Sequence, residues 1–247
     1  MKADNVKFIK IDGENLPYTV EHRMIRHPRL EFRGERLLVI LPTGWGDESH
    51  LLKEKMGWIS KKHWKIRAAL EKLKSQANGS NSLPIFGEFF EIRWGKSLVF
   101  DAEEKVIEFD PNDGNQVKRL GAMFKKMLAD ELQKAVTYYS RQFGVSFKKI
   151  CIKRQRSKWG SCSFRGNLNF NLHLVYLPKE LVWYLACHEV AHLRVKGHGK
   201  SFWSLVKGEF ENYREMEKRL FEYWIFIQEC AESVFPRARH LFNPLDL

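Results

Sequence analysis

Three histidines and a glutamate within residues 188–198 carry the clearest chemistry in the chain. His188 and His192 belong to an HExxH pentad with Glu189 between them, and His198 follows shortly after. Residues four apart on an α-helix lie on one face, because one turn takes 3.6 residues, so both imidazoles can hold one metal ion. Imidazole nitrogens are common zinc ligands, and the spacing therefore predicts a zinc site.

Glu189 and His198 decide what kind of zinc site this is. Glu189 lies about 100° around the helix from His188, so it stays out of the ligand set but can act as general base toward water. His198 is the candidate third ligand if the chain leaves the helix near residues 195–197, where Gly197 permits a turn. The alternative is that His198 is an exposed loop residue and a downstream glutamate completes the site.

Three protein ligands with one open position are typical of catalytic zinc, whereas four are typical of structural zinc. The spacing therefore favours metal-assisted hydrolysis. Three basic residues crowd the motif, Arg194, Lys196 and Lys200, and are candidates for substrate binding. The hydroxyl of Ser161, in the turn-rich segment 159–163, is another candidate, although this segment is more typical of a buried Trp and Cys that hold a hairpin in place.

The elements predicted around the motif are both helical and extended. Residues 178–194 form the metal-binding helix, with Leu181, Tyr184 and Leu185 on the face of His188, so that the histidines point inward. Residues 168–174 alternate apolar and polar, which predicts a strand that forms one wall of the cleft and could take a peptide as an added strand. Long helices are predicted at residues 117–143 and 213–234.

The first half of the chain is predicted to consist mainly of strands. Together with the helices of the second half, this predicts an α+β fold. Strands are expected at 6–11, 18–20, 37–41 and in a second set within 85–109, with a helix near 47–75. The strongest break is at residues 110–115, and no internal repeat is visible. We expect a β-rich N-terminal domain, residues 1–112, and a zincin-like metallohydrolase domain, residues 113–247, with a small antiparallel sheet plus helices and a helical C-terminal tail.

The net charge of +12 is spread along the chain rather than gathered in one stripe, so a nucleic-acid partner is only weakly supported. No apolar run has the length of a membrane span, and no secretory core follows the N-terminus. The 4 cysteines are scattered and do not resemble a disulfide framework. These features favour a cytoplasmic protein without a membrane partner.

With these residues in place, the sequence resembles the YgjP-like metal-dependent hydrolases, which are similar to SprT-type and other small HExxH metallopeptidases. The resemblance is strong over about residues 115–205. It rests on the segments 157–163, 166–171 and 174–178, on His188 to His192, and on His198 with Phe202 and Trp203. The resemblance implies that His188, His192 and His198 bind zinc and that Glu189 is the catalytic base.

Three functions remain open at this stage. The leading one is a zinc-dependent metallopeptidase-like hydrolase acting on a peptide. The second keeps the metal but hydrolyses a nucleoside triphosphate, with Arg194, Lys196 and Lys200 on the phosphates. The third is a nucleic-acid-associated module in which zinc has only a structural role and stabilises the fold.

Overall fold

The computed structural model describes residues 6–77, 81–155 and 157–233, which form two compact units. Unit 1 spans Met1–Ser75 and unit 2 spans Gln76–Leu247. The sequence placed the boundary at residue 112, at the break in the chain. The second set of strands instead belongs to unit 2, because the N–H of Phe86 donates to the carbonyl of Val175 and the side chain of Gln116 binds the carbonyl of Lys96.

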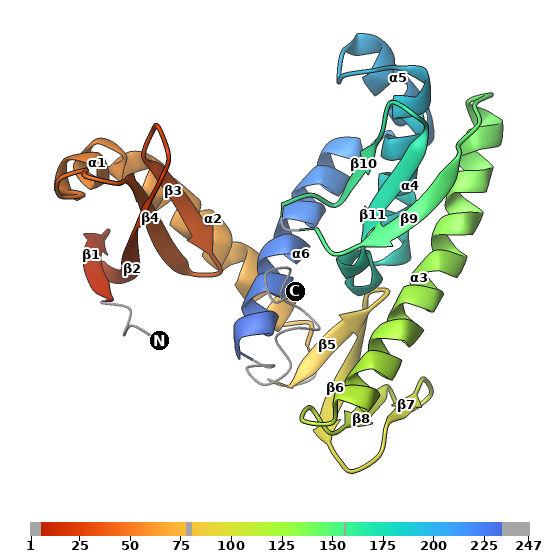
Figure 1. The fold of residues 1–247 in the computed structure, drawn as a ribbon, viewed down its shortest axis with the longest axis horizontal. Coiled ribbons are helices and arrows are strands. Elements are labelled where there is room, and N and C mark those ends of the chain that lie inside the picture. The colour runs from red at the N-terminus through yellow and green to blue at the C-terminus, as the bar shows by residue number, and fades with distance from the viewer. Residues whose placement is uncertain (1–5, 78–80, 156, 234–247) are drawn as a thin grey trace. The chain divides into compact units, whose positions relative to one another are not determined.

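Unit 1 is a four-stranded sheet followed by two helices (Figure 1). Its strands are β1 (Lys7–Ile11), β2 (Glu14–Arg23), β3 (Arg29–Arg33) and β4 (Arg36–Pro42), in the order β1-β2-β4-β3. The helix expected at 47–75 is divided into α1 (Ser49–Glu54) and α2 (Met56–Lys74), because Lys55 leaves helical geometry at φ −95° and ψ 6°. The core of the unit consists of Ile11, Leu16, Tyr18, Leu37, Val39, Leu41, Leu52 and Ile59.

Unit 2 begins with a sheet of the same topology. Its strands are β5 (Ser82–Ile85), β6 (Glu88–Trp94), β7 (Val99–Asp101) and β8 (Val106–Phe109), in the order β5-β6-β8-β7. In both sheets the first pair is antiparallel, the second parallel and the third antiparallel. Each sheet is therefore one copy of an internal structural repeat, which the sequence did not reveal.

The hairpin turns and the register support this repeat. The turns Asp12-Gly13 and Phe86-Gly87 both have positive φ at each central residue, 48° and 91° in the first and 49° and 86° in the second. Two consecutive positive φ angles are the geometry of a type I′ turn. The paired positions that follow are Tyr18, Leu37 and Phe32 in one sheet and Ile92, Ile107 and Phe100 in the other.

The remainder of unit 2 carries the predicted metal motif. It comprises α3 (Gly114–Gln142), β9 (Lys149–Lys153), β10 (Gly160–Cys162), β11 (Asn167–Asn171), the 3₁₀ helix η1 (Leu172–Tyr176), α4 (Lys179–Arg194), α5 (Lys200–Glu209) and α6 (Tyr213–Ser233). The expected α+β class is confirmed. Position 234, in the tail helix predicted at 213–234, lies outside the described residues.

The small sheet differs from expectation in two ways. Its order is β10-β11-β9, with β10 antiparallel and β9 parallel to β11, so it is mixed rather than wholly antiparallel. The strand predicted at 168–174 stops at Asn171, because the side chain of Asn171 accepts from the N–H of His173 and starts η1. β11 is paired on both sides, and it therefore has no free edge for an added peptide strand.

Helix α4 is held at its start by the second copy of the repeat. Pro178 is its N-cap, and a Cβ on Gly87 would lie 3.0 Å from the backbone of Pro178. Glu131 of α3 accepts a 2.6 Å hydrogen bond from the indole of Trp183. These contacts fix the N-terminal part of α4. In the described part of the chain, no helix has the length and apolar character that a bilayer crossing requires.

Candidate metal centre

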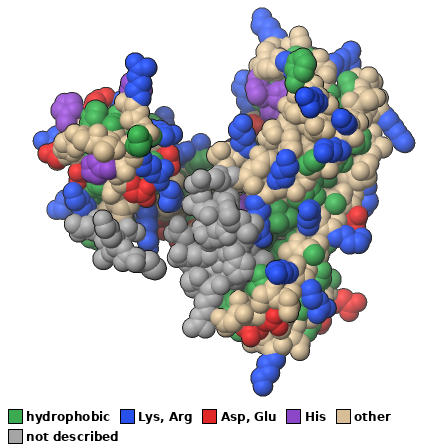
Figure 2. Space-filling view, in the orientation of Figure 1, with side chains coloured by type: hydrophobic (Ala, Val, Ile, Leu, Met, Phe, Trp, Pro, Cys, Tyr) green, Lys and Arg blue, Asp and Glu red, His purple; other side chains and the backbone are tan. Residues whose placement is uncertain are grey.

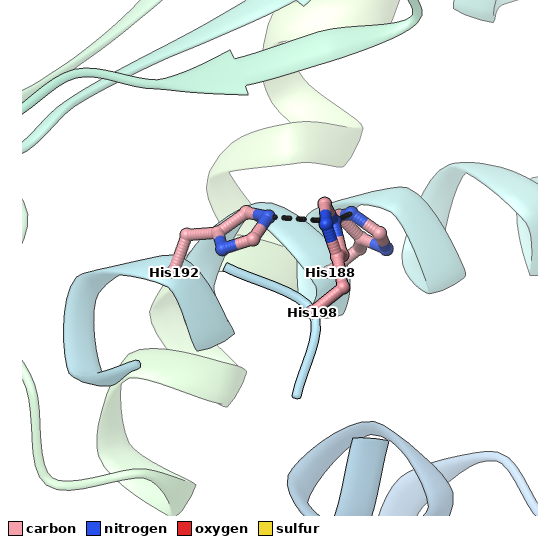
Figure 3. Close-up of side chains that lie close together, drawn as sticks. All are labelled: His188, His192 and His198. Atoms are coloured by element: carbon pink, nitrogen blue, oxygen red, sulfur yellow. Dashed lines mark hydrogen bonds between the residues drawn. The ribbon is translucent and has the colours of Figure 1, made fainter. Parts of the chain in front are cut away.

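The three histidines come together from α4 and the loop that follows it. His188 and His192 project from one face of α4, which ends at Arg194 with Val195 in extended geometry as its C-cap. Gly197 then takes φ 78°, in the left-handed region that favours glycine. The chain turns where the sequence predicted, and this turn brings His198 back toward the helix (Figure 3).

The Nε2 atoms of the three rings face one another. Nε2 of His198 lies 3.1 Å from Nε2 of His188 and 3.2 Å from Nε2 of His192. Nitrogens at about 2.0–2.1 Å from a tetrahedral zinc ion are about 3.3–3.4 Å apart. The spacing therefore fits a divalent metal ion, and among the described residues these three histidines are the group whose donor atoms converge in this way.

The side chain of Phe202 contacts the rings of all three histidines. It is fully buried in α5, and its ring centroid lies 4.9 Å from that of His188, 4.5 Å from His192 and 4.8 Å from His198. An aromatic ring in contact with all three imidazoles limits their rotation. The packing of α5 against α4 therefore helps to hold the donor atoms in place before a metal binds.

The pKa values of two of the three histidines are lowered, which favours the neutral form that binds a metal. Burial, together with His192 and His198 nearby, lowers the pKa of His188 to about 3. Burial also lowers the pKa of His192. Nδ1 of His192 lies 3.3 Å from the carbonyl of Val195, a contact that directs Nε2 toward the centre.

Glu189 is buried beside the histidines and is only 5% exposed. Its Oε2 has no hydrogen-bond partner in the described structure. Burial raises the pKa of its carboxyl to about 7, and the charge of Lys158 acts in the opposite direction. A buried carboxyl oxygen without a hydrogen-bond partner lowers the stability of the fold. Such groups with shifted pKa values are typical of functional sites.

One face of β10 forms the wall opposite Glu189. A Cβ added to Gly160 would lie 2.7 Å from Oε1 of Glu189, so the carboxylate occupies the space that a larger residue would need. Side chains two apart on a strand share a face, which places Cys162 on the side of Gly160. The charge of Lys158, two residues before the strand, also acts on Glu189. Lys158 and Gly160 were not predicted as site residues, although both lie in the segment 157–163, which carries part of the family resemblance.

The four candidates for substrate contact are placed differently from one another. The guanidinium of Arg194 donates to the carbonyl of Phe143 at the end of α3, and the ammonium of Lys196 donates to the carbonyl of His192. Strand alternation puts the side chain of Ser161 on the face away from Gly160. Lys200 is exposed and lines an open hollow.

That hollow lies directly beside the third histidine. Its volume is about 590 Å³, and its lining includes His198, Lys200, Trp203, Lys207 and Tyr213. The rings of Trp203 and Tyr213 are stacked at 4.8 Å. A group held at the three histidines would therefore have this surface next to it.

The family model described as YgjP-like, metallopeptidase domain, matches residues 26–223. No curated protein matches the chain significantly. Among solved structures, the chain is similar to the metallopeptidase zymogen abylysin of Pyrococcus abyssi, with 24% identity, a TM-score of 0.34, and 36% of this chain and 90% of that chain covered. It is also similar to the zymogen jannalysin of Methanocaldococcus jannaschii, with 23% identity, a TM-score of 0.35, and coverage of 38% and 96%.

Proposed function

The chain belongs to the YgjP-like metallopeptidase family, and on that premise we propose that it is a zinc-dependent peptidase whose metal ligands are His188, His192 and His198. Membership makes the protein a metal-dependent, peptidase-like hydrolase. The convergence of the three Nε2 atoms beside one buried carboxylate is the observation that carries the proposal. When bound, zinc supplies Lewis acidity, which polarises a carbonyl and acidifies water.

Glu189 is the general base in this proposal. Its Oε2 is buried and unpartnered, so it is free to accept a proton from the attacking water and to pass that proton to the leaving amine. Gly160 leaves room for the carboxylate at this position. Lys158 holds a positive charge near Glu189, where it favours the ionised form that a base requires.

The free edge of β10 is the best-supported place for the peptide backbone. The N–H of Asn171 donates to the carbonyl of Trp159, and the N–H of Ser163 donates to the carbonyl of Asn167. Successive residues of an antiparallel strand point their backbone groups alternately toward and away from the partner strand, and those of Trp159 and Ser163 point toward β11. Gly160 and Cys162 therefore present N–H and C=O groups at an edge beside Glu189, where an extended substrate can add as a strand.

Hydrolysis of a nucleoside triphosphate is less well supported. Of the three basic residues expected on the phosphates, Arg194 and Lys196 donate to backbone carbonyls. Lys200 alone of the three lines the hollow beside His198. The structural observations therefore favour a peptide over a triphosphate.

Replacing the base tests the proposal. The variant Glu189→Gln keeps the shape of the side chain but cannot accept a proton, so peptide hydrolysis should fall by about 10²–10⁴-fold. Metal content, measured by atomic emission on the purified protein, should stay at the wild-type level because Glu189 is not a ligand in the proposal. Glu103→Gln, in the exposed turn before β8, is the matched control and should behave as wild type.

Retention of wild-type turnover by Glu189→Gln would show that the base lies elsewhere. A protein that releases phosphate from nucleotides and cleaves no peptide would instead favour the rival substrate.

A further inference from the structure

We propose that the hollow beside His198 is a subsite for an acidic side chain of the substrate, so that the enzyme prefers peptide bonds flanked by Asp or Glu. This inference rests on the proposed peptidase function and names the class of peptide. The residues that carry it are Lys200, Trp203, Lys207 and Tyr213.

The position of the hollow follows from the helix that forms it. Residues 200, 203, 204 and 207 lie at spacings of three and four, so they share one face of α5, while Phe202 and Val206 are buried on the other. The buried face supports the histidines through Phe202. On the exposed face, the ring centroid of Trp203 lies 5.9 Å from that of His198, and His198 itself lines the hollow. The hollow therefore adjoins any substrate whose scissile bond is held at the three histidines.

The charge of the hollow is one-sided. Lys200 and Lys207 both line it, and no acidic residue is among the described residues that do so. In the described part of the chain neither ammonium group has a carboxylate partner, whereas Lys126, Lys134 and Lys218 each have one on their own helix. Two unneutralised charges on one rim favour an anionic group between them.

The apolar part of the hollow favours a side chain over a free ion. Trp203 and Tyr213 stack at 4.8 Å with an interplanar angle of 28°, and both rings are half-buried. They offer a surface for the methylene groups of Asp or Glu, while the lysines reach the carboxylate. Figure 2 shows lysine, arginine and histidine side chains together at the end of unit 2 that carries α5.

The test is to read every bond that the metal-loaded protein cleaves in a proteome-derived peptide mixture by mass spectrometry. Asp and Glu should be enriched about fivefold or more within two residues of the cleaved bonds, as expected for two exposed charge contacts. Raised salt should reduce the enrichment, because such contacts are screened. The variant Lys200→Glu/Lys207→Glu should lose it and favour Lys and Arg instead.

The matched control is Lys118→Glu/Lys125→Glu on α3. These exposed lysines have the same two-turn spacing and lie in the same unit, so the net charge changes equally while the hollow is untouched. This control should keep the acidic preference. An equal loss of preference in both double variants would assign the effect to net charge and overturn the subsite.

A binding measurement separates recognition from turnover. In the Glu189→Gln background, a fluorescent peptide with one Glu beside the cleaved position should bind about fivefold more tightly than its Gln counterpart, and Lys200→Gln/Lys207→Gln should abolish this difference. Cleavage without acidic preference would overturn the subsite and leave the peptidase function standing. Absence of cleavage of any peptide would overturn both, and a nucleotide that displaces the peptide through these lysines would assign the hollow to phosphate.

Discussion

Gly160 stands where any side chain would displace the carboxylate of Glu189. A Cβ there would lie 2.7 Å from Oε1 and 3.0 Å from the carboxyl carbon, and the buried carboxylate has little room to retreat. The variant Gly160→Ala should therefore lower kcat by about tenfold or more, since small misplacements of a reacting group are costly. Its metal content should not change, because the histidines are untouched.

The control for this prediction is Gly46→Ala, where an added Cβ meets nothing within 4 Å. Full activity in Gly160→Ala would mean that the position of Glu189 is not critical for hydrolysis.

Glu189 also makes a prediction about pH in the metal-free protein. Its pKa in the fold, about 7, lies above its ordinary 4.5, so the folded state holds the proton more tightly than the unfolded state. This stabilisation is complete below about pH 4.5 and is lost as the pH rises through about 7. Gln does not ionise, so metal-free Glu189→Gln should exceed metal-free wild type in stability at pH 8, by on the order of 3 kcal/mol.

Urea unfolding at pH 4.5 and pH 8 measures this difference. Burial lowers the pKa of His188, so its contribution to stability rises with pH, opposite to that of Glu189. This contribution is the same in wild type and variant and cancels in the comparison. A stability difference between the two proteins that does not grow with pH would contradict a raised pKa for the buried carboxyl group of Glu189.

At the scale of elements, the loop after α4 sets the position of His198. Gly197 has φ 78° and open space where a Cβ would be, so Gly197→Ala introduces backbone strain without a clash. Strain of about 1–2 kcal/mol in the left-handed region should weaken zinc binding by about tenfold. Titration against a competing chelator measures this change.

Gly44→Ala is the control, since Gly44 has φ 83° and equally open space but lies in unit 1. It should lose similar folding stability and keep its zinc affinity. Equal affinities in wild type and Gly197→Ala would mean that the turn does not position the third ligand.

Sequence periodicity and glycine positions predicted the elements near the site well. The features that they did not predict depend on side-chain contacts and on strand pairing between distant segments. The 3.6-residue periodicity located α4, and Gly197 marked the turn toward His198. The alternation in 168–174 gave no sign that Asn171 would start η1 with its own side chain. Nor could it show that β11 pairs with β9 as well as β10, which moves the free edge to β10.

At the scale of the whole molecule, the two copies of the sheet were invisible in the sequence because few of their residues match. They share a pattern of burial and turn geometry instead: Leu16 and Phe90 are both buried two residues after the turn-closing glutamates. Side chains of different shape fill equivalent places. The expected boundary at residue 112 differs from the division between Ser75 and Gln76, because a break in the chain does not reveal where the flanking strands pack.

Metal removal should affect the two units unequally. The proposed ligands all lie in α4 and the following loop of unit 2, and binding stabilises only the state that holds the ion. Chelation should therefore speed hydrogen exchange in α4 and α5, while β1 to β4 keep their protection. Exchange followed by mass spectrometry with and without chelator measures this, and an equal loss of protection in both units would contradict a metal site confined to unit 2.

Anomalous diffraction at the zinc edge, from crystals of the metal-loaded protein, tests directly whether the three histidines bind one zinc ion. We expect a single zinc ion at about 2.0–2.1 Å from Nε2 of His188, His192 and His198, with the remaining position open to solvent and facing Glu189. An ion held by other residues, or a fourth protein ligand that closes the site, would contradict it.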